Sequence, residues 1–165
     1  MDFNNIGDIK KNGFSGFKSA TELWLDKSII PRVKGVYLVI NPAYNKTEFI
    51  YPGVGGFFKG RNPNVPVSEL KSNYVDNSQV VYIGKAGSPT GNGTLNSRLG
   101  QYLRFGKTKN VGHWGGRLIW QLKNNADLIF CWKLTPKENP REVEKRLLHE
   151  YLNQFGVRPF ANLTG

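Results

Sequence analysis

Residues 79–105 read QVVYIGKAGSPTGNGTLNSRLGQYLRF, and this stretch decides which fold we expect. The opening QVVYI is rich in β-branched and aromatic residues and is followed by a glycine, which predicts a strand over residues 79–83. The turn-forming residues 87–93 predict a loop. Residues 94–105 place their apolar side chains on one face at about 100° per residue. They begin with Thr94, a favoured N-cap residue, so they predict an amphipathic helix.

Two further runs of β-forming residues lie on either side of this stretch. Residues 35–40 (GVYLVI) and 128–134 (LIFCWKL) each predict a strand, and residues 46–51 predict a shorter one. Glycine and proline recur through residues 52–78 too often for a long element. We therefore expect a loop-rich insert at about 41–78.

Helices are predicted at three more places. Residues 140–155 follow a capping sequence in which Asn139 caps the helix and Glu142 returns the hydrogen bond to the cap. Residues 114–124 show mixed periodicity and residues 20–26 a short helical pattern. The order of elements is mainly strands, then helices, one strand and a final helix. This order predicts the α+β class, with a small central antiparallel sheet flanked by helices and no βαβ repeat.

Length and composition are typical of one globular domain. The chain has 165 residues, of which 39% are hydrophobic and 21% charged. We expect a single domain over 1–165, with a polar lead-in at 1–34 and a core at 35–162. The apolar runs fall far short of the ~20 residues that cross a bilayer, and the first residues contain no apolar signal region. The single cysteine, Cys131, excludes an internal disulfide. We therefore expect a cytoplasmic protein with no membrane partner.

The charge indicates a polyanionic partner. Twenty-three Lys and Arg residues against twelve Asp and Glu give a formal net charge of +11, which is typical of nucleic-acid binding, although a solvated basic surface is the alternative. No carboxylate occurs between Asp76 and Asp127. The cations in that window are Lys85, Arg98, Arg104, Lys107, Lys109, Arg117 and Lys123. Membrane binding is not expected, because no basic amphipathic helix with an exposed apolar face accompanies them.

Two charged side chains fall on or beside helix faces that should be buried. At about 100° per residue, Glu144 lies in the middle of the apolar arc of the last helix. A carboxylate there is costly unless it is paired or binds a metal, so Glu144 is either a metal ligand or half of a structural ion pair. Arg98 borders the apolar stripe of its own helix. It either extends outward along apolar surface or holds a phosphate.

Several common sites are excluded. A phosphate-binding P-loop ending at Gly106-Lys107-Thr108 would need a glycine where the chain has Gln101. The two histidines, His113 and His149, have no partner at metal-ligand spacing, so a zinc site is not expected. No G-x-S-x-G nucleophile motif occurs.

Five elements in order resemble the GIY-YIG nuclease superfamily. The tripeptide GVY at 35–37 looks like its first signature, and YIG at 82–84 matches its second. The following KA and the LNSRLGQYL of 95–103 look like the family's strand, loop and helix. EKRLL at 144–148 and PFAN at 159–162 look like its closing Glu-helix-Asn motif. The chain is especially similar to the catalytic domain of the bacterial excision-repair incision subunit. The segment of about forty residues between its two signatures is longer than in compact members of the family, but long inserts occur in relatives that resemble restriction endonucleases.

The resemblance implies phosphodiester hydrolysis with one divalent metal, Mg²⁺ or Mn²⁺, bound by Glu144. It also implies roles for five other residues: Tyr82 in activating the nucleophile, Tyr37 in ordering the water network, Arg98 in stabilising charge on the phosphate, Asn162 in holding the site together from the carboxyl end, and Lys85 where some members carry a functional lysine. We expect Tyr37, Tyr82, Arg98 and Glu144 around one concave surface. A Glu144 carboxylate across the sheet from Arg98 would contradict this arrangement.

The expected function is therefore a metal-dependent endonuclease that cuts DNA. The alternative is a non-catalytic or partner-dependent nucleic-acid-binding module on the same scaffold. The residues expected to contact nucleic acid are Arg104, Lys107, Lys109, His113 and Arg117. The sequence leaves open whether residues 113–117 form a substrate-contact loop or only the turn into a helix. It also leaves open the choice between DNA and RNA, and between a monomer and a homodimer.

Overall fold

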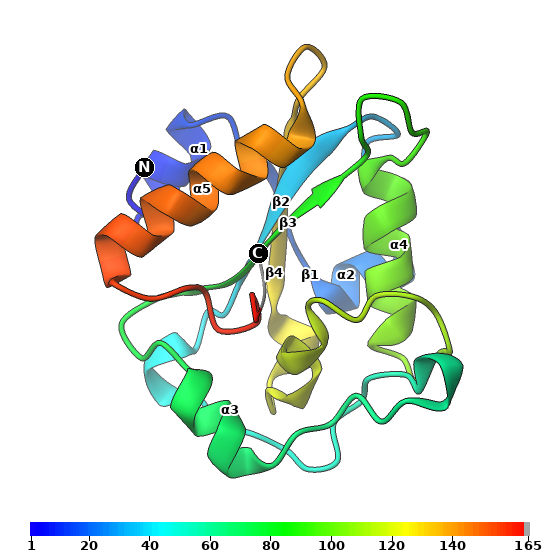
Figure 1. Cartoon of the computed structure of the whole chain (residues 1–165), viewed down its shortest axis with the longest axis vertical. Coiled ribbons are helices and arrows are strands. Elements are labelled where there is room, and N and C mark those ends of the chain that lie inside the picture. The colour runs from blue at the N-terminus through cyan, green and yellow to red at the C-terminus, as the bar shows by residue number, and fades with distance from the viewer. Residues whose placement is uncertain (164–165) are drawn as a thin grey trace.

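The computed structural model of the chain describes residues 1–163, which contain one four-stranded sheet in the order β1-β4-β2-β3 (Figure 1). Every neighbouring pair of strands is antiparallel. The strands are β1 (Ser15–Ser19), β2 (Gly35–Ile40), β3 (Val80–Ala86) and β4 (Ile129–Leu134). The α+β class and the small antiparallel sheet are thus confirmed. The order makes β2 and β4 central, whereas β1 and β3 are edge strands.

Helices cover both faces of this sheet. The α-helices within residues 1–163 are α1 (Ile6–Lys11), α2 (Ala20–Leu25), α3 (Val67–Asn73), α4 (Leu95–Phe105) and α5 (Pro140–Phe155). Figure 1 shows α4 on one side of the sheet and α5 on the other. No helix in the described residues has the length and apolar character needed to span a bilayer.

The central strand β2 explains this two-sided packing. All six of its residues are buried, and alternate side chains point to opposite faces of a strand. Tyr37 and Val39 pack in the α4-side cluster, which also contains Leu99 and Tyr102 of α4. Val36, Leu38 and Ile40 pack in the α5-side cluster, which also contains Val143 and Leu147 of α5. The apolar run GVYLVI has no polar face because both faces are covered by helices.

The helix caps predicted from the sequence are mostly confirmed. Thr94 and Ser97 form a capping box at the start of α4, in which the Ser97 amide donates to Thr94 Oγ1 (3.2 Å) and the Thr94 amide to Ser97 Oγ (2.9 Å). The Asn139 side chain accepts from the Arg141 amide (3.0 Å) and caps α5. Glu142 does not return this bond. Its carboxylate pairs instead with Lys145, at 3.3 Å.

Two expected elements differ in the structure. Residues 46–51 are not a strand: a 3₁₀ turn occupies Tyr44–Lys46, and the segment keeps one isolated bridge, between Phe49 and Leu122. Residues 114–124 contain a 3₁₀ helix at Arg117–Gln121 rather than an α-helix. The residues from Leu118 to Leu122 are all buried. A segment buried on all sides has no amphipathic period, so its pattern could not distinguish the two helix types.

The lead-in and the insert contain elements that were not predicted. The strand β1 carries one apolar residue, Phe17, and forms because the exposed edge of β4 is available for pairing. The helix α3 lies inside the insert and buries only Leu70. The Gln121 carboxamide fastens the insert, because it accepts from the Val65 amide (2.9 Å) and donates to the Val65 and Ile50 carbonyls.

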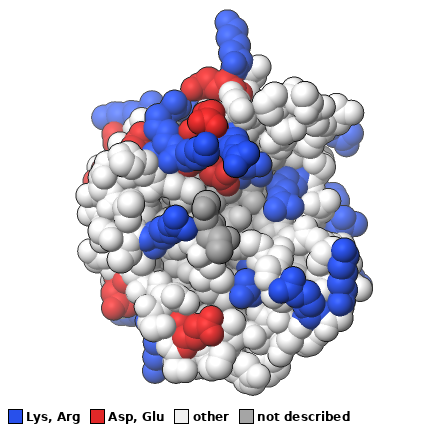
Figure 2. Space-filling model, in the orientation of Figure 1, with Lys and Arg blue, Asp and Glu red and all other residues white. Residues whose placement is uncertain are grey.

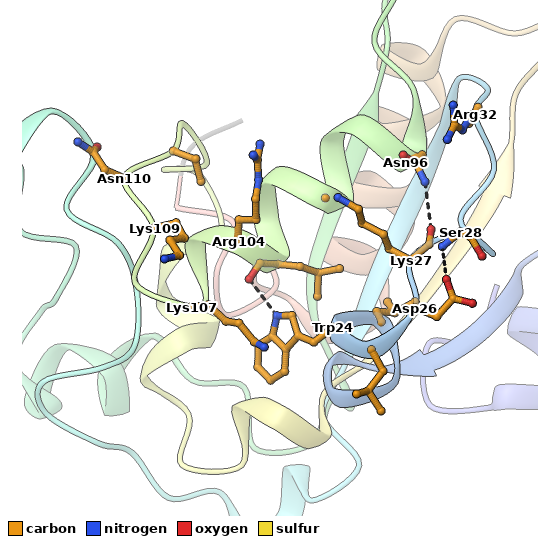
Figure 3. Close-up of a pocket in the computed structure, with 15 residues that line it drawn as sticks. Trp24, Asp26, Lys27, Ser28, Arg32, Asn96, Arg104, Lys107, Lys109 and Asn110 are labelled. Carbon is orange, nitrogen blue, oxygen red and sulfur yellow. Dashed lines mark hydrogen bonds between the residues drawn. The ribbon is translucent and has the colours of Figure 1, made fainter.

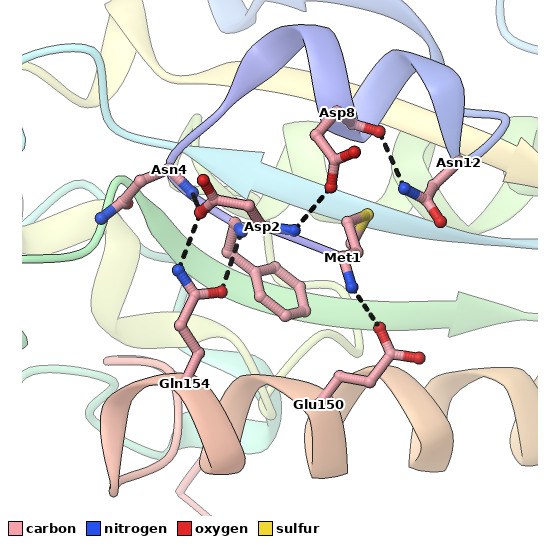
Figure 4. Close-up of polar contacts among 8 residues, drawn as sticks. Met1, Asp2, Asn4, Asp8, Asn12, Glu150 and Gln154 are labelled. Carbon is pink, nitrogen blue, oxygen red and sulfur yellow. Dashed lines mark hydrogen bonds and ion pairs between the residues drawn. The ribbon is translucent and has the colours of Figure 1, made fainter.

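The first residues of the chain belong to the core and are not a separate lead-in. Figure 4 shows Met1 and Asp2 lying against α5, where the amino group contacts Glu150 (3.2 Å) and Gln154 Nε2 donates to Asp2 (2.8 Å). Phe3 is fully buried in the α5-side cluster and packs edge-on against Tyr151, with ring centroids 5.2 Å apart. These contacts hold α5, and with it Glu144, against the sheet.

The substitution Phe3→Ala tests this assignment. We expect the free energy of unfolding to fall by about 3–4 kcal/mol, because a large buried ring is lost and a cavity remains. Urea unfolding followed by circular dichroism measures the change. Phe57→Ala is the matched control, since Phe57 is 52% exposed and its removal should cost less than about 0.5 kcal/mol. Equal effects of the two variants would contradict a structural role for the first residues.

Candidate active site at the edge strand β3

The candidate site is centred on β3, the edge strand that lies between α4 and α5. Tyr82 packs in the α4-side cluster and Ile83 in the α5-side cluster. Because side chains alternate along a strand, Lys85 lies on the same face as Ile83. Strand β3 therefore presents Tyr82 toward the helix that carries Arg98, and Lys85 toward the helix that carries Glu144.

The glycine of the YIG signature makes room for two tyrosine rings. Gly84 pairs with Tyr37 across the β2–β3 ladder. A Cβ atom at Gly84 would lie 2.5 Å from Cζ of Tyr37 and 2.8 Å from Cε1 of Tyr82. Such separations are too short for non-bonded carbon atoms. The absence of a side chain at Gly84 thus allows both rings to meet, with centroids 6.0 Å apart.

Both tyrosines keep their protons at neutral pH. Burial raises the pKa of Tyr37 well above its ordinary value, and the neighbouring Tyr82 raises it further. Burial also raises the pKa of Tyr82, although the Arg98 charge opposes this shift. Tyr37 is fully buried, whereas Tyr82 is 7% exposed. Tyr82 is therefore the phenol of the pair that touches solvent, and it acts as a neutral hydrogen-bonding group.

Arg98 is half-buried, and one nitrogen of its guanidinium group donates hydrogen bonds within the protein. Its Nη1 donates to the Gly112 carbonyl (3.3 Å) and to the Gln101 side chain (3.5 Å). It forms no ion pair with any carboxylate of residues 1–163. Its remaining donors are therefore available to an anion such as a phosphate.

Glu144 lies at the margin of the buried face of α5, which corrects its expected place in the middle. The residues of α5 that are buried are Pro140, Val143, Leu147 and Tyr151. Leu152 is 42% exposed, so the buried face is narrower than the apolar arc and is displaced from Glu144. Glu144 itself is half-buried.

The Glu144 carboxylate has no ion-pair partner in the described part of the chain. No hydrogen bond or ion pair to it occurs within 4.0 Å, so the structural ion pair considered from the sequence finds no support. Burial raises the pKa of Glu144, and the charges of Lys85, Arg98 and Arg141 oppose that rise. The carboxylate is thus partly desolvated and surrounded by cations that do not touch it.

The helices that carry Arg98 and Glu144 pack on opposite faces of the sheet. The two side chains therefore approach β3 from helices on different faces, and one concave surface around all four residues stays a prediction. The two side chains nevertheless share one electrostatic environment around β3, because the Arg98 charge lowers the pKa of Glu144. The Glu144 charge in turn raises the pKa of both Tyr82 and Tyr37. Tyr82 thus lies on the edge strand with Tyr37 behind it on β2, and Arg98 and Glu144 belong to helices on either side.

The Asn162 side chain hydrogen-bonds to the outer edge of β3 at Ile83, the middle residue of the YIG tripeptide. Its side chain accepts from the Ile83 amide (2.9 Å) and donates to the Ile83 carbonyl (2.8 Å). The Ala161 amide also donates to the Val81 carbonyl (2.9 Å). These bonds satisfy an edge that otherwise lacks a strand partner, and they fix the backbone between Tyr82 and Gly84. Asn162 is thus a positioning residue.

His113 lies inside the site and is not a surface contact for nucleic acid. It is fully buried, and its ring stacks on Tyr102 with centroids 3.7 Å apart. Its Nε2 lies 3.4 Å from the Tyr37 hydroxyl. Burial, together with the Arg98 charge, holds the pKa of His113 well below its usual value. A neutral, buried imidazole cannot attract phosphates by charge, so the expected binding role is corrected to packing beside Tyr37.

Arg117 connects the site with the insert. Its guanidinium lies over the Trp114 ring at 4.6 Å from the centroid, and Arg61 of the insert lies over the same ring at 4.4 Å. A Cβ at the adjoining Gly115 would lie 3.6 Å from the Tyr82 hydroxyl. Residues 113–116 are therefore a loop beside Tyr82 that leads into the 3₁₀ helix beginning at Arg117, and the insert brings Arg61 to it. The sequence contained no signal for this pairing.

The remaining predicted binding residues, Arg104, Lys107 and Lys109, are exposed but lie elsewhere. At about 100° per residue, Arg104 is rotated about 120° from Arg98 around α4. All three line a separate cavity together with residues of α2 (Figure 3). Figure 2 shows the basic side chains on the right of the view without carboxylates among them, whereas those over α5 are mixed with carboxylates. Of the seven cations of the acid-free window, Arg104, Lys107 and Lys109 thus line this cavity, Lys85, Arg98 and Arg117 lie near β3, and Lys123 pairs with Glu48 at 2.7 Å.

The donor groups of the site fit a magnesium-like ion. Among residues 1–163, no group of three or more His, Cys, Asp and Glu side chains is placed to hold a metal. Zn²⁺ and Ca²⁺ sites need several protein ligands. Mg²⁺, by contrast, keeps several waters and is commonly bound by one or two carboxylates together with substrate phosphates. The partnerless carboxylate of Glu144 meets that smaller requirement.

Comparisons with known proteins add no relative. The chain matches no protein-family model, no curated protein and no solved structure. The resemblance to the GIY-YIG superfamily therefore rests on the sequence signatures alone.

Proposed function

We propose that the protein is a divalent-metal-dependent endonuclease that hydrolyses DNA phosphodiester bonds. The observation that carries the proposal is the half-buried, partnerless carboxylate of Glu144 beside Arg98 and the tyrosine pair at β3. Burial disfavours the charged form of this carboxylate and the neighbouring cations offset that only in part, and a bound ligand would explain why it is present.

Cationic side chains would hold the reacting phosphate. Arg98 has free guanidinium donors in a half-buried setting, where hydrogen bonds to a phosphate are stronger than in bulk water. Lys85 approaches from the other face of β3 and adds a second positive charge. Both act on the phosphoryl oxygens, where negative charge develops as the water attacks phosphorus and the bond to the leaving oxygen breaks.

The tyrosines would position the attacking water. Burial raises the pKa of Tyr82, so it keeps its proton at neutral pH and its hydroxyl can orient a water by hydrogen bonding. Tyr37 lies behind it, next to His113, and fixes the Tyr82 ring. Glu144 would hold Mg²⁺ or Mn²⁺ through its carboxylate. When bound, such an ion polarises phosphoryl oxygens and lowers the pKa of bound water.

The alternative is a non-catalytic nucleic-acid-binding module on the same scaffold. It explains the basic surfaces but gives no reason for an unpaired, half-buried carboxylate at Glu144. Incubation with supercoiled plasmid separates the two functions. We expect nicked and linear DNA with Mg²⁺ or Mn²⁺ and unchanged plasmid with EDTA. Binding without cleavage in either metal would favour the module. A cytoplasmic location is part of the same proposal.

We also expect duplex binding to depend steeply on salt. The structure gathers five cations near β3 and residues 113–117: Arg61, Lys85, Arg98, Arg117 and Arg141. If each contacts one phosphate, the slope of log K against log salt is about −4 to −5. Fluorescence anisotropy of a labelled duplex in EDTA across a salt series measures this slope. A flat dependence would mean that these cations form only a solvated surface.

A further inference from the structure

A second basic surface lies on the far side of α4 from Arg98. There a cavity of about 820 Å³ opens between α2, α4 and residues 107–111. Figure 3 shows Trp24 and Lys27 from α2 and the segment after it, facing Arg104 of α4 and the lysines that follow. We call this cavity the α2–α4 groove. The candidate active-site residues do not line it: these are Tyr37, Tyr82, Lys85, Arg98, Glu144 and Asn162.

The rim of the groove is strongly cationic. The basic residues that line it are Lys27, Arg32, Arg104, Lys107 and Lys109. None of them forms an ion pair within the described residues. Asp26 is the one carboxylate of the lining, and it accepts a hydrogen bond from the Ser28 amide (2.8 Å). Five cations without an ion pair in the described residues outnumber the one carboxylate, which makes the groove complementary to a polyanion.

The floor of the groove is apolar and holds an aromatic ring. Trp24 is half-buried, and its indole nitrogen donates to the Leu103 carbonyl (3.0 Å), which fixes the ring against α4. The ring stacks on Trp120, with centroids 6.0 Å apart, and the Lys107 ammonium lies over it at 4.9 Å. Leu25, at the groove margin, is 85% exposed. A base can stack on this fixed ring once the flexible Lys107 side chain moves from the ring to a phosphate of the same strand.

We propose that the α2–α4 groove binds a single-stranded segment of DNA, with phosphates on the basic rim and a base against Trp24. The groove favours a single strand over a duplex because paired bases are stacked on each other and cannot offer a face to a ring in a cavity. Its volume lies in the range of sites that enclose small ligands, which suits individual nucleotides. The proposal rests on the proposed function only in taking DNA as the nucleic acid.

A triple variant tests the rim. We expect Lys27→Ala, Arg104→Ala and Lys107→Ala together to weaken binding of a fluorescent 20-nucleotide oligothymidine by about 100-fold at 0.1 M salt, because three contacts with a slope of ~0.7 each are lost. Binding of a blunt 20-bp duplex should change less than about 3-fold. The control is Lys11→Ala, Lys46→Ala and Lys71→Ala, which removes the same charge from exposed positions outside the groove. Binding is measured by anisotropy in EDTA, and thermal melting confirms that each variant is folded.

Photo-crosslinking locates the base. An oligothymidine that contains 5-iododeoxyuridine is bound to the protein and irradiated. Tryptic digestion should then show the crosslink on the peptide that contains Trp24. Crosslinks confined to residues 113–117, equal weakening by both triple variants, or equal weakening of single strand and duplex would each overturn the proposal. Because binding is measured without metal, the two proposals fail separately. If the unmutated protein cleaves plasmid but the groove triple variant binds oligothymidine normally, the groove proposal alone is refuted. If the groove triple variant binds oligothymidine about 100-fold more weakly but the unmutated protein does not cleave plasmid, the proposed nuclease function alone is refuted.

Discussion

Replacing Glu144 by glutamine is expected to abolish plasmid cleavage, by at least about 10³-fold, and to leave DNA binding nearly unchanged. The amide has the size of the carboxylate but cannot supply the charge that a divalent ion requires, so stabilisation of the transition state is lost. Plasmid nicking in Mg²⁺ and duplex anisotropy in EDTA measure the two properties. Glu142→Gln is the control on the same helix, because Glu142 is exposed and pairs only with Lys145.

The same variant should be at least as stable as the unmutated protein at neutral pH without metal. Burial raises the pKa of Glu144 in the folded state, so folding favours the protonated form. The carboxylate therefore lowers stability as the pH rises from the unfolded pKa through the higher folded pKa. Glutamine does not ionise, so its advantage should be present at pH 7 and should vanish below both pKa values. Urea unfolding of both proteins in EDTA, at pH 7 and at a pH below both pKa values, measures this difference in the free energy of unfolding. A large loss of stability at pH 7 would instead indicate a structural ion pair.

Arg98→Ala is expected to lower kcat by about 10³-fold at saturating DNA, the lower end of the contribution of an arginine to phosphoryl transfer. The loss should fall on kcat because charge on the phosphate is greatest in the transition state. Arg98→Lys should recover only part of the rate, since a lysine cannot reproduce the planar set of donors. Initial rates with a short labelled duplex measure both variants.

Arg146→Ala is the matched control for Arg98. Arg146 is an exposed residue of α5 whose side chain pairs with Glu138 at 3.0 Å, so its loss should leave kcat unchanged. If Arg98→Ala raised KM with kcat unchanged, Arg98 would be a binding residue that contributes equally to ground state and transition state. That result would contradict the role proposed for Arg98.

The parts of the fold that were predictable are those with local signals. The helix α4 was readable because Thr94 and Ser97 cap it within four residues of chain. The helix α5 was readable from Asn139 and Pro140 at its start and from Gly156, with a φ of 74°, at its end. Strand β1 could not be predicted, because SGFKS has little strand pattern and forms only against the edge of β4.

The candidate site shows the same division. The sequence signatures that nominate Tyr37, Tyr82, Arg98 and Glu144 each lie within a single element, so these residues could be named from the sequence as candidates. It misplaced His113, since the partners that bury this side chain, Tyr37 and Tyr102, come from distant segments. The stacking of Arg61 and Arg117 on Trp114 likewise joins the insert to a loop more than fifty residues away, and no short-range pattern records it.

The sequence by itself determined the class of the fold, the ends of its main helices and the identity of the charged and aromatic residues. Those properties depend on backbone preferences and on the spacing of neighbours a few residues apart. Only the tertiary structure decided that α4 and α5 cover opposite faces, that the candidate site lies at β3, and that Arg104, Lys107 and Lys109 line the α2–α4 groove instead. Those properties depend on which distant segments exclude water from each other, and burial of that kind is fixed only when the whole chain packs.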